Sequence, residues 1–113
     1  MRSAAQEERK ARNEAFFREV NERIEDTAGR LISHADEEWE YLCECADPQC
    51  TERVKLTRSE YAAVRSDPRR FVLAPGHIDR QVEHVLTADS ERVVVEKDGL
   101  AGIVATELDP RTS

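Results

Sequence analysis

The sequence predicts an α+β fold, in which a long N-terminal amphipathic helix precedes a small antiparallel β-rich domain with one short helix and a structural zinc site. Three observations support this prediction. The first 31 residues contain no proline and are rich in Glu, Arg and Ala, which favour helices. Beyond residue 35, apolar and polar residues alternate between turn-forming residues, as in short strands. All three cysteines fall within residues 43–50.

The length of 113 residues suits a single small domain with an appended arm. We expect a helical arm over residues 1–35, a β-rich zinc-binding domain over residues 36–110 and a flexible tail over residues 111–113. Hydrophobic residues make up 39% of the chain and charged residues 36%, so the apolar core must be small. The net charge of −7 argues against a general nucleic-acid-binding protein.

The setting of the chain is expected to be the cytoplasm. No apolar stretch approaches the roughly 20 residues that a membrane span needs, and residues 1–10 are too polar to resemble a secretory signal. We therefore expect a protein that has no membrane contact and whose thiols stay reduced.

The arm is expected to be helical from about residue 4 to residue 32. An apolar stripe recurs along it at spacings of three and four: Phe17, Val20, Ile24, Thr27 and Leu31. Two interpretations stay open: the stripe packs on its own domain, or it pairs with a second copy or another protein. The first dozen residues have little to bury, so we expect them to fray or to project.

Residues 52–80 carry an excess of positive charge. Their basic side chains are Arg53, Lys55, Arg58, Arg65, Arg69, Arg70 and Arg80. Residues 1–51, in contrast, carry seven basic and thirteen acidic side chains. We expect the basic segment either to meet the arm or another acidic partner, or to lie in solvent beside neighbouring carboxylates.

The domain is expected to open with a hairpin and a short helix. Alternation through Trp39 predicts one strand, Asp47-Pro48-Gln49 predicts a turn, and alternation around Val54 predicts a second, antiparallel strand. The run from Thr57 to Glu60 has the form of a capping box, which begins a helix. That helix must end before Asp67-Pro68, because a residue preceding proline disfavours the helical conformation.

The rest of the domain is expected to be extended. Residues 71–73 form a short apolar strand that ends at the turn Pro75-Gly76-His77. Residues 78–88 fit a helix or a strand, and their β-branched residues favour the extended form. Residues 93–95 are a strand, and Asp98-Gly99 predicts a hairpin with a return strand over residues 103–105.

The three cysteines are the main candidates for chemistry. Cys43 and Cys45 face the same side if the strand continues through both, and the following turn can bring Cys50 back towards them. Three thiols cannot pair off within one chain, so a metal is favoured over a disulfide framework. Zinc takes four sulfur or nitrogen ligands in a tetrahedron. The alternative is that the thiols are small buried side chains or redox-active groups.

A histidine is expected to supply the fourth ligand. His77 is the first choice, because the Pro75-Gly76 turn can present it from the end of a strand in the same sheet as the cysteines. His34, at the end of the arm, is the second choice. His84 is expected to be an ordinary strand residue. A closed site of this kind would be structural rather than catalytic, because it leaves no position for water.

The run Cys43-Glu44-Cys45-Ala46-Asp47-Pro48-Gln49-Cys50, together with Pro75-Gly76-His77 and Val94-Val95-Glu96-Lys97, resembles a family of small, uncharacterised bacterial proteins found mostly in actinobacteria. The resemblance covers roughly residues 14–110. It implies that the three cysteines and the Pro-Gly-His turn belong to one pattern, and it implies a bacterial cytoplasmic setting. It implies no activity.

These observations favour a non-enzymatic, zinc-stabilised interaction or regulatory module that meets a partner, or a second copy, through its helix. The alternative is a cysteine-based redox sensor or thiol enzyme. Acidic neighbours such as Glu44 and Asp47 are expected to raise the pKa of the thiols and so to disfavour the reactive thiolate. The sequence also lacks a Gly-rich phosphate loop and the signature of a serine nucleophile.

Overall fold

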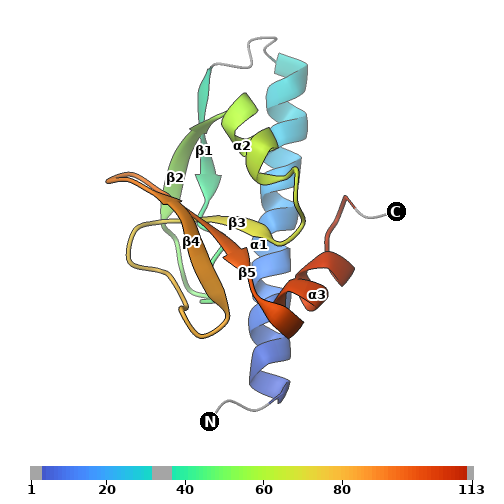
Figure 1. The fold of residues 1–113 in the computed structure, drawn as a ribbon. Coiled ribbons are helices and arrows are strands. Elements are labelled where there is room, and N and C mark those ends of the chain that lie inside the picture. Colours follow the sequence, from blue (N-terminus) through green and yellow to red (C-terminus); the bar gives the residue numbers. More distant parts are fainter. Residues whose placement is uncertain (1–3, 32–36, 112–113) are drawn as a thin grey trace.

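The computed structural model describes residues 4–31 and 37–111, and it confirms the α+β class (Figure 1). The elements follow in the order α1 (Ala4–Leu31), β1 (Glu38–Leu42), β2 (Arg53–Thr57), α2 (Arg58–Val64), β3 (Arg70–Leu73), β4 (Glu83–Ala88), β5 (Val93–Lys97) and α3 (Gly99–Glu107). Helix α1 runs the length of the molecule, with the sheets on one side of it and α3 against its N-terminal half. No helix in the described ranges is long and apolar enough to cross a membrane.

The strands form two separate antiparallel sheets. Strands β1 and β2 make the expected hairpin, in which Tyr41 pairs with Val54. The second sheet has the order β3-β5-β4, so β5 is its central strand. The extended form expected within residues 78–88 is confirmed from Glu83 onwards, and turns precede it. One expectation is wrong: the strand before His77 lies in the second sheet, whereas the cysteines follow a strand of the first.

Helix α2 confirms the expected capping box. The Thr57 hydroxyl accepts a hydrogen bond from the Glu60 N–H at 3.1 Å, and the Glu60 carboxylate accepts one from the Thr57 N–H at 2.8 Å. Two donors at the start of the helix are thereby satisfied. The helix ends at Val64, before Asp67-Pro68, as expected.

The return strand expected over residues 103–105 is wrong, because Gly99 begins a helix. Strand β5 already has β3 on one edge and β4 on the other, so a further strand has no free edge to pair with. Asp98 instead takes the extended conformation of a helix N-cap. Helix α3 lies close to the sheet at Gly102, where a Cβ atom would approach the Lys97 carbonyl oxygen to 3.0 Å.

The apolar core lies between the two sheets and α2. Its buried members include Tyr41, Val54, Leu56, Tyr61, Phe71, Val72, Leu73, Val93 and Val95. Tyr41 and Tyr61 stack with their ring centroids 4.4 Å apart. These residues are few, which agrees with the small core that the composition implies.

Helix α1 packs on the body of its own chain, but with a different face from the one expected. Glu14, Phe17, Arg18 and Asn21 are buried, so the inward face is largely polar. Of the expected apolar stripe, only Phe17 is fully buried: Val20 and Ile24 are half-buried and Thr27 is exposed. The side chain of Leu31 lies outside the described residues.

The expected mobility of the two ends of the chain stays a prediction. Helix α1 begins at Ala4, and its first turns project past α3, as one of the two expectations for the first dozen residues had it (Figure 1). Lys10 also pairs with Asp79 at 3.1 Å. Residues 112 and 113 of the expected tail lie outside the described residues, whereas Arg111 pairs with Glu22 at 2.8 Å.

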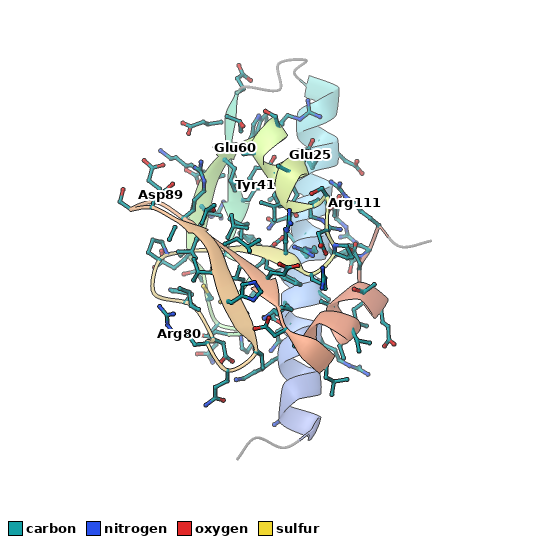
Figure 2. The ribbon with its side chains drawn as sticks, viewed as in Figure 1. Glu25, Tyr41, Glu60, Arg80, Asp89 and Arg111 are labelled. Carbon is teal, nitrogen blue, oxygen red and sulfur yellow. The ribbon has the colours of Figure 1, made fainter. Side chains whose placement is uncertain are left out.

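The basic segment follows both expectations: two of its arginines meet carboxylates of the arm, whereas Arg53 and Arg69 are more exposed and lie beside carboxylates of the domain. Arg58 pairs with Glu25 at 2.9 Å, and Arg65 pairs with Glu22 at 2.6 Å. The Tyr41 hydroxyl also donates to Glu25 at 2.8 Å (Figure 2). Charged contacts therefore hold α1 against the domain along its C-terminal half.

Candidate metal centre

The structure brings together the four residues that the sequence singles out. One ligand atom from each of Cys43, Cys45, Cys50 and His77 lies within 4.8 Å of the other three. The sulfurs of Cys43 and Cys50 are each 3.6 Å from His77 Nδ1. A tetrahedral zinc ion with ordinary bond lengths separates a sulfur ligand from a nitrogen ligand by about 3.6 Å. The cluster is therefore geometrically suited to hold a metal ion.

Of the other two histidines, only His84 lies in the described residues, and it is not part of this cluster. His34 lies outside the described residues. His84 is on β4, where its Nδ1 lies 2.7 Å from a carboxylate oxygen of Asp98 and its Nε2 lies 3.6 Å from Glu96. It is half exposed and engaged with carboxylates, which agrees with the expectation that it is an ordinary strand residue.

Local backbone bonds bring the three sulfurs together. The Cys43 N–H donates to the Glu52 carbonyl at 3.1 Å, which carries the pairing of the hairpin one residue past β1. A turn follows, in which the Cys50 N–H donates to the Asp47 carbonyl at 3.1 Å and the Gln49 N–H to the Asp47 carboxylate at 2.9 Å. The turn returns Cys50 towards Cys43, as the sequence predicted.

His77 comes from the other sheet. The turn after β3 places Gly76 at a φ of +87°, a conformation that favours glycine, and the His77 N–H donates to the Ala74 carbonyl at 3.2 Å. The two sheets are also joined by the Glu44 N–H, which donates to the Val72 carbonyl at 2.8 Å. An ion held by all four residues would therefore connect the hairpin to the second sheet.

A backbone N–H stabilises the Cys43 sulfur: the Ala74 N–H donates to Cys43 Sγ at 3.1 Å. Such a bond favours the thiolate over the thiol and fixes the orientation of a metal ligand. The backbone of Asp47 and of Glu52 likewise acts to lower the pKa of Cys45 and of Cys50, respectively.

The pKa values of the three thiols shift in different directions. The hydrogen bond from Cys43 lowers the pKa of Cys45 to about 5, against the effect of burial. The same hydrogen bond, together with burial, raises the pKa of Cys43, and burial raises the pKa of Cys50. We expected acidic neighbours such as Glu44 and Asp47 to raise the thiol pKa. Cys45 departs from this expectation, because the hydrogen bond from Cys43 is the largest influence on its pKa and lowers it.

Glu44 is the residue that sequence reasoning missed. It is fully buried between two cysteines, and its carboxylate accepts bonds from Arg18 at 3.3 Å and from the Val72 N–H at 3.2 Å. It also accepts bonds from Asn21 at 3.0 Å and from the Tyr61 hydroxyl at 2.9 Å. We call Arg18, Asn21, Glu44 and Tyr61 the α1 network. Alternation alone placed Glu44 in solvent, because it does not reveal that α1 covers that face.

Helix α1 contacts the cysteine segment at every second residue. Asn21 both donates to the Leu42 carbonyl at 3.0 Å and accepts from the Leu42 N–H at 2.7 Å. Asn13 donates to the Ala46 carbonyl at 3.1 Å. With Glu44 between them, these contacts hold one side of the segment whose other side carries the sulfurs.

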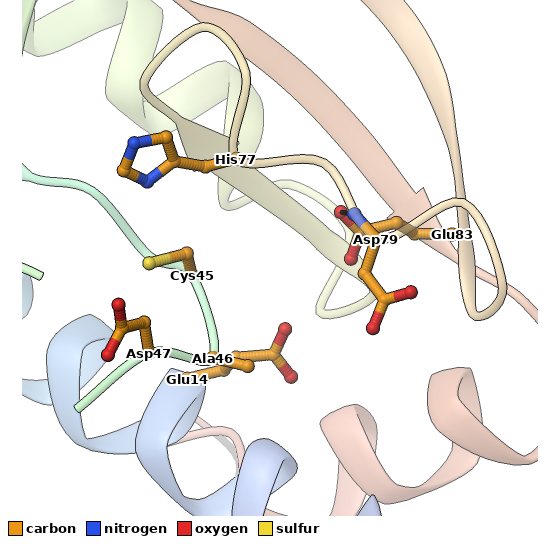
Figure 3. Close-up of a pocket in the computed structure, with 7 residues that line it drawn as sticks. All are labelled: Glu14, Cys45, Ala46, Asp47, His77, Asp79 and Glu83. Atoms are coloured by element: carbon orange, nitrogen blue, oxygen red, sulfur yellow. Dashed lines mark hydrogen bonds between the residues drawn. The ribbon is translucent and has the colours of Figure 1, made fainter. Parts of the chain in front are cut away.

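The cluster opens on one side into an acidic hollow of about 300 Å³. Figure 3 shows Cys45 and His77 on one side of this hollow, and the carboxylates of Asp79 and Glu83 on the other. Glu14 also lines it and, with Glu83, pairs with the buried Lys97. The positive charge of Lys97 therefore offsets part of the negative charge of the carboxylates that line the hollow.

Comparison with known proteins adds no family to this description. No protein-family model matches the chain. Comparisons with curated proteins and with solved structures found no match either. What the site can do is therefore argued from its own geometry.

Proposed function

We propose that this protein is a non-enzymatic interaction or regulatory module of the bacterial cytoplasm, stabilised by one structural Zn²⁺ bound to Cys43, Cys45, Cys50 and His77. The observation that carries the proposal is the convergence of three sulfurs and one imidazole nitrogen at distances that fit a tetrahedron. Four protein ligands complete the coordination of zinc and leave no position for a reacting water.

The donor types support zinc over other common metals. Thiolates and imidazole are soft or borderline ligands, whereas magnesium and calcium prefer oxygen. Three cysteines with one histidine form one of the ordinary ligand sets of structural zinc. Cys43 and Cys45 are buried and Cys50 and His77 are half-buried, which suits a permanent ion rather than an exchanging substrate.

The position of the cluster gives the ion a structural role. Its ligands come from the β1–β2 connection and from the turn after β3, so zinc would join two sheets that share few other bonds. Small domains with few apolar residues often rely on such a metal. Binding of a structural zinc contributes directly to the free energy of folding.

The proposal is tested by measuring the metal content of the purified protein and its thermal unfolding with and without a chelator. We expect one equivalent of zinc per chain, and loss of the ion together with the folded structure. Metal-free protein that unfolds cooperatively would contradict the proposal.

The ligand set is tested by comparing His77→Ala with His84→Ala. We expect the first variant to bind zinc at least about tenfold more weakly, because one of four ligands is lost. The second is the matched control and should retain zinc, because His84 lies among carboxylates on β4. Equal retention in both variants would remove His77 from the site.

The alternative function, a redox sensor or thiol enzyme, is favoured by the proximity of the three thiols, which are free in this structure. The same preparation separates the two proposals. Metal-free, folded protein with one rapidly alkylated cysteine supports the thiol chemistry, whereas zinc-bound protein that resists alkylation supports the structural site.

A further inference from the structure

The outward face of α1 carries apolar side chains that its own domain does not cover. Phe16 is 61% exposed, Val20 and Ile24 are half-buried, and Thr27 is exposed. Phe17, which the heptad spacing placed in a pairing seam, points into the body instead. The uncovered stripe therefore keeps Val20, Ile24 and Thr27 of the predicted seam but has Phe16 in place of Phe17.

A hollow of about 270 Å³ lies on this stripe. Its wall consists of Val20, Arg23, Ile24 and Thr27 from α1, with Trp39 from β1 at the side. The four helical residues stand at positions i, i+3, i+4 and i+7. That is the arrangement of the hole that receives one side chain of a facing helix in knobs-into-holes packing.

We propose that two copies of this chain pair through α1 in antiparallel orientation, so that Phe16 of each copy fills the hollow of the other. Phe16 is the exposed large side chain of this face, and it lies two turns before the hollow. The midpoint between residue 16 and residue 24 is residue 20. A two-fold axis near Val20 therefore places each Phe16 against the Ile24 region of the second copy.

The charges beside the stripe support the same orientation. Arg12, Glu19, Arg23 and Asp26 are exposed, and their spacings of seven, four and three place them in one row along α1. The signs alternate along the row. When a second helix runs antiparallel beside the first, its row follows the reverse order. Each positive side chain of one helix then faces a negative side chain of the other.

The charge pairing also locates the axis. Arg12 faces Asp26 of the second copy about a midpoint at residue 19, and Glu19 faces Arg23 about a midpoint at residue 21. Both agree with the axis near residue 20 that the Phe16 packing requires. In a parallel pair this row would face the other side of the second helix, so the row meets its own copy only when the helices are antiparallel.

The expected association is weak. A seam one helix wide is smaller than the about 800 Å² per partner that standard stable interfaces bury. We therefore expect a dissociation constant in the micromolar range rather than the nanomolar range. Sedimentation of the zinc-loaded protein should follow a monomer–dimer equilibrium up to several hundred micromolar.

The packing is tested with Phe16→Ala, which should fold normally because Phe16 is largely exposed. We expect at least about tenfold weaker dimerisation, because the symmetric interface loses two buried aromatic rings. Ile103→Ala is the matched control: Ile103 is 57% exposed on α3 and does not line the hollow, so its loss should leave the equilibrium unchanged. A monomeric wild type, or a dimer that is weakened only by Ile103→Ala, would overturn the proposal.

The orientation is tested with charge reversal. Glu19→Arg alone and Arg23→Glu alone should each weaken the dimer, because each places like charges opposite each other in two symmetric pairs. The double variant restores opposite charges and should recover most of the wild-type affinity. Each single change also breaks the 3.3 Å pair of Glu19 and Arg23 within one helix, and the double change restores it, so the helicity of each variant is measured beside its dimerisation. If the double variant is weaker than either single variant at unchanged helicity, the antiparallel arrangement is wrong. Because the variants lie outside the zinc site, their failure would not affect the proposed metal function.

Discussion

The metal cluster and the α1 network differ in how their buried polar groups are satisfied. Both place polar groups inside a domain whose apolar core is small. The cluster brings four donors to one point and leaves them to be satisfied by an ion. The α1 network satisfies its buried carboxylate with protein donors alone, from α1, from α2 and from the backbone of β3. The buried carboxylate of Glu44 thus has four protein donors, although other buried polar atoms, such as Arg18 Nε and Trp39 Nε1, have no hydrogen-bond partner.

The two regions meet at consecutive residues. Cys43 and Cys45 face the cluster, and Glu44 between them faces α1. An ion bound in the cluster and helix α1 would thus hold opposite sides of one extended segment. A change on either side of this segment is expected to alter the other.

The largest loss of stability is expected from Cys43→Ser, which removes one of the four residues of the metal cluster. Structural zinc contributes on the order of 10 kcal/mol or more to folding, which is comparable to the whole stability of a small domain. We expect the variant to lose zinc and cooperative unfolding together, as seen by circular dichroism and metal analysis. If it remains folded without metal, the α1 network alone suffices and the cluster is not the main source of stability.

The next largest effect is expected from Glu44→Ala. This change leaves the Arg18 guanidinium buried without its carboxylate and removes the acceptor of Asn21 and Tyr61. Breaking a buried charge pair in this way costs about 3–5 kcal/mol. Urea unfolding of the zinc-loaded protein measures the loss.

The control for this variant is Glu40→Ala. Glu40 is an exposed residue of the preceding strand β1, with a 4.0 Å contact to Arg53. Its loss should change the free energy of unfolding by no more than about 0.5 kcal/mol. Equal losses in the two variants would mean that the buried network has no special role.

A pH effect is expected from Glu14, which joins α1 to the buried Lys97. Burial raises the pKa of Glu14 to about 7, despite the attraction of Lys97. Between the unfolded pKa of 4.5 and this value the folded state binds the proton more tightly, so this group's contribution to stability falls as the pH rises.

The effect of Glu14 is isolated by comparison with Glu14→Gln. Relative to the variant, the wild type should lose about 2–3 kcal/mol between pH 5 and pH 8. Using the difference between the two proteins removes the pH dependence of metal binding, which both share. A difference that does not change with pH would show that Glu14 stays ionised.

The smallest effect is expected outside both regions, at the capping box of α2. Thr57→Ala removes the acceptor of the Glu60 N–H and should cost about 1 kcal/mol. Thermal unfolding of the zinc-loaded protein measures it. This value sets the scale of an ordinary local contact, against which the other two regions can be judged.

Local chemistry made much of this fold predictable. The capping box of α2, the hairpin of β1 and β2 and the turn before His77 all depend on residues close together in sequence. The metal cluster was predictable for a similar reason, because three of its four ligands are within eight positions of one another. The fourth needed a choice among three histidines, and the turn chemistry of Pro75-Gly76 decided it.

The errors came from long-range contacts. The hairpin predicted at Asp98-Gly99 failed because β3, which is distant in sequence, occupies the edge of β5 that a return strand would need. The polar inward face of α1 was not predicted, because residues such as Arg18 and Asn21 usually lie on the exposed face of a helix. Only the position of Glu44 on the facing segment makes them interior residues.

The side wall of the hollow on α1 has a practical consequence. Trp39 is the single tryptophan of the chain, so all indole emission arises from this one place. Its ring is half-buried beside Val20 and Ile24, where a neighbouring side chain would exclude water from it. The tryptophan fluorescence of the unlabelled protein therefore reports whether the Trp39 ring is exposed to water.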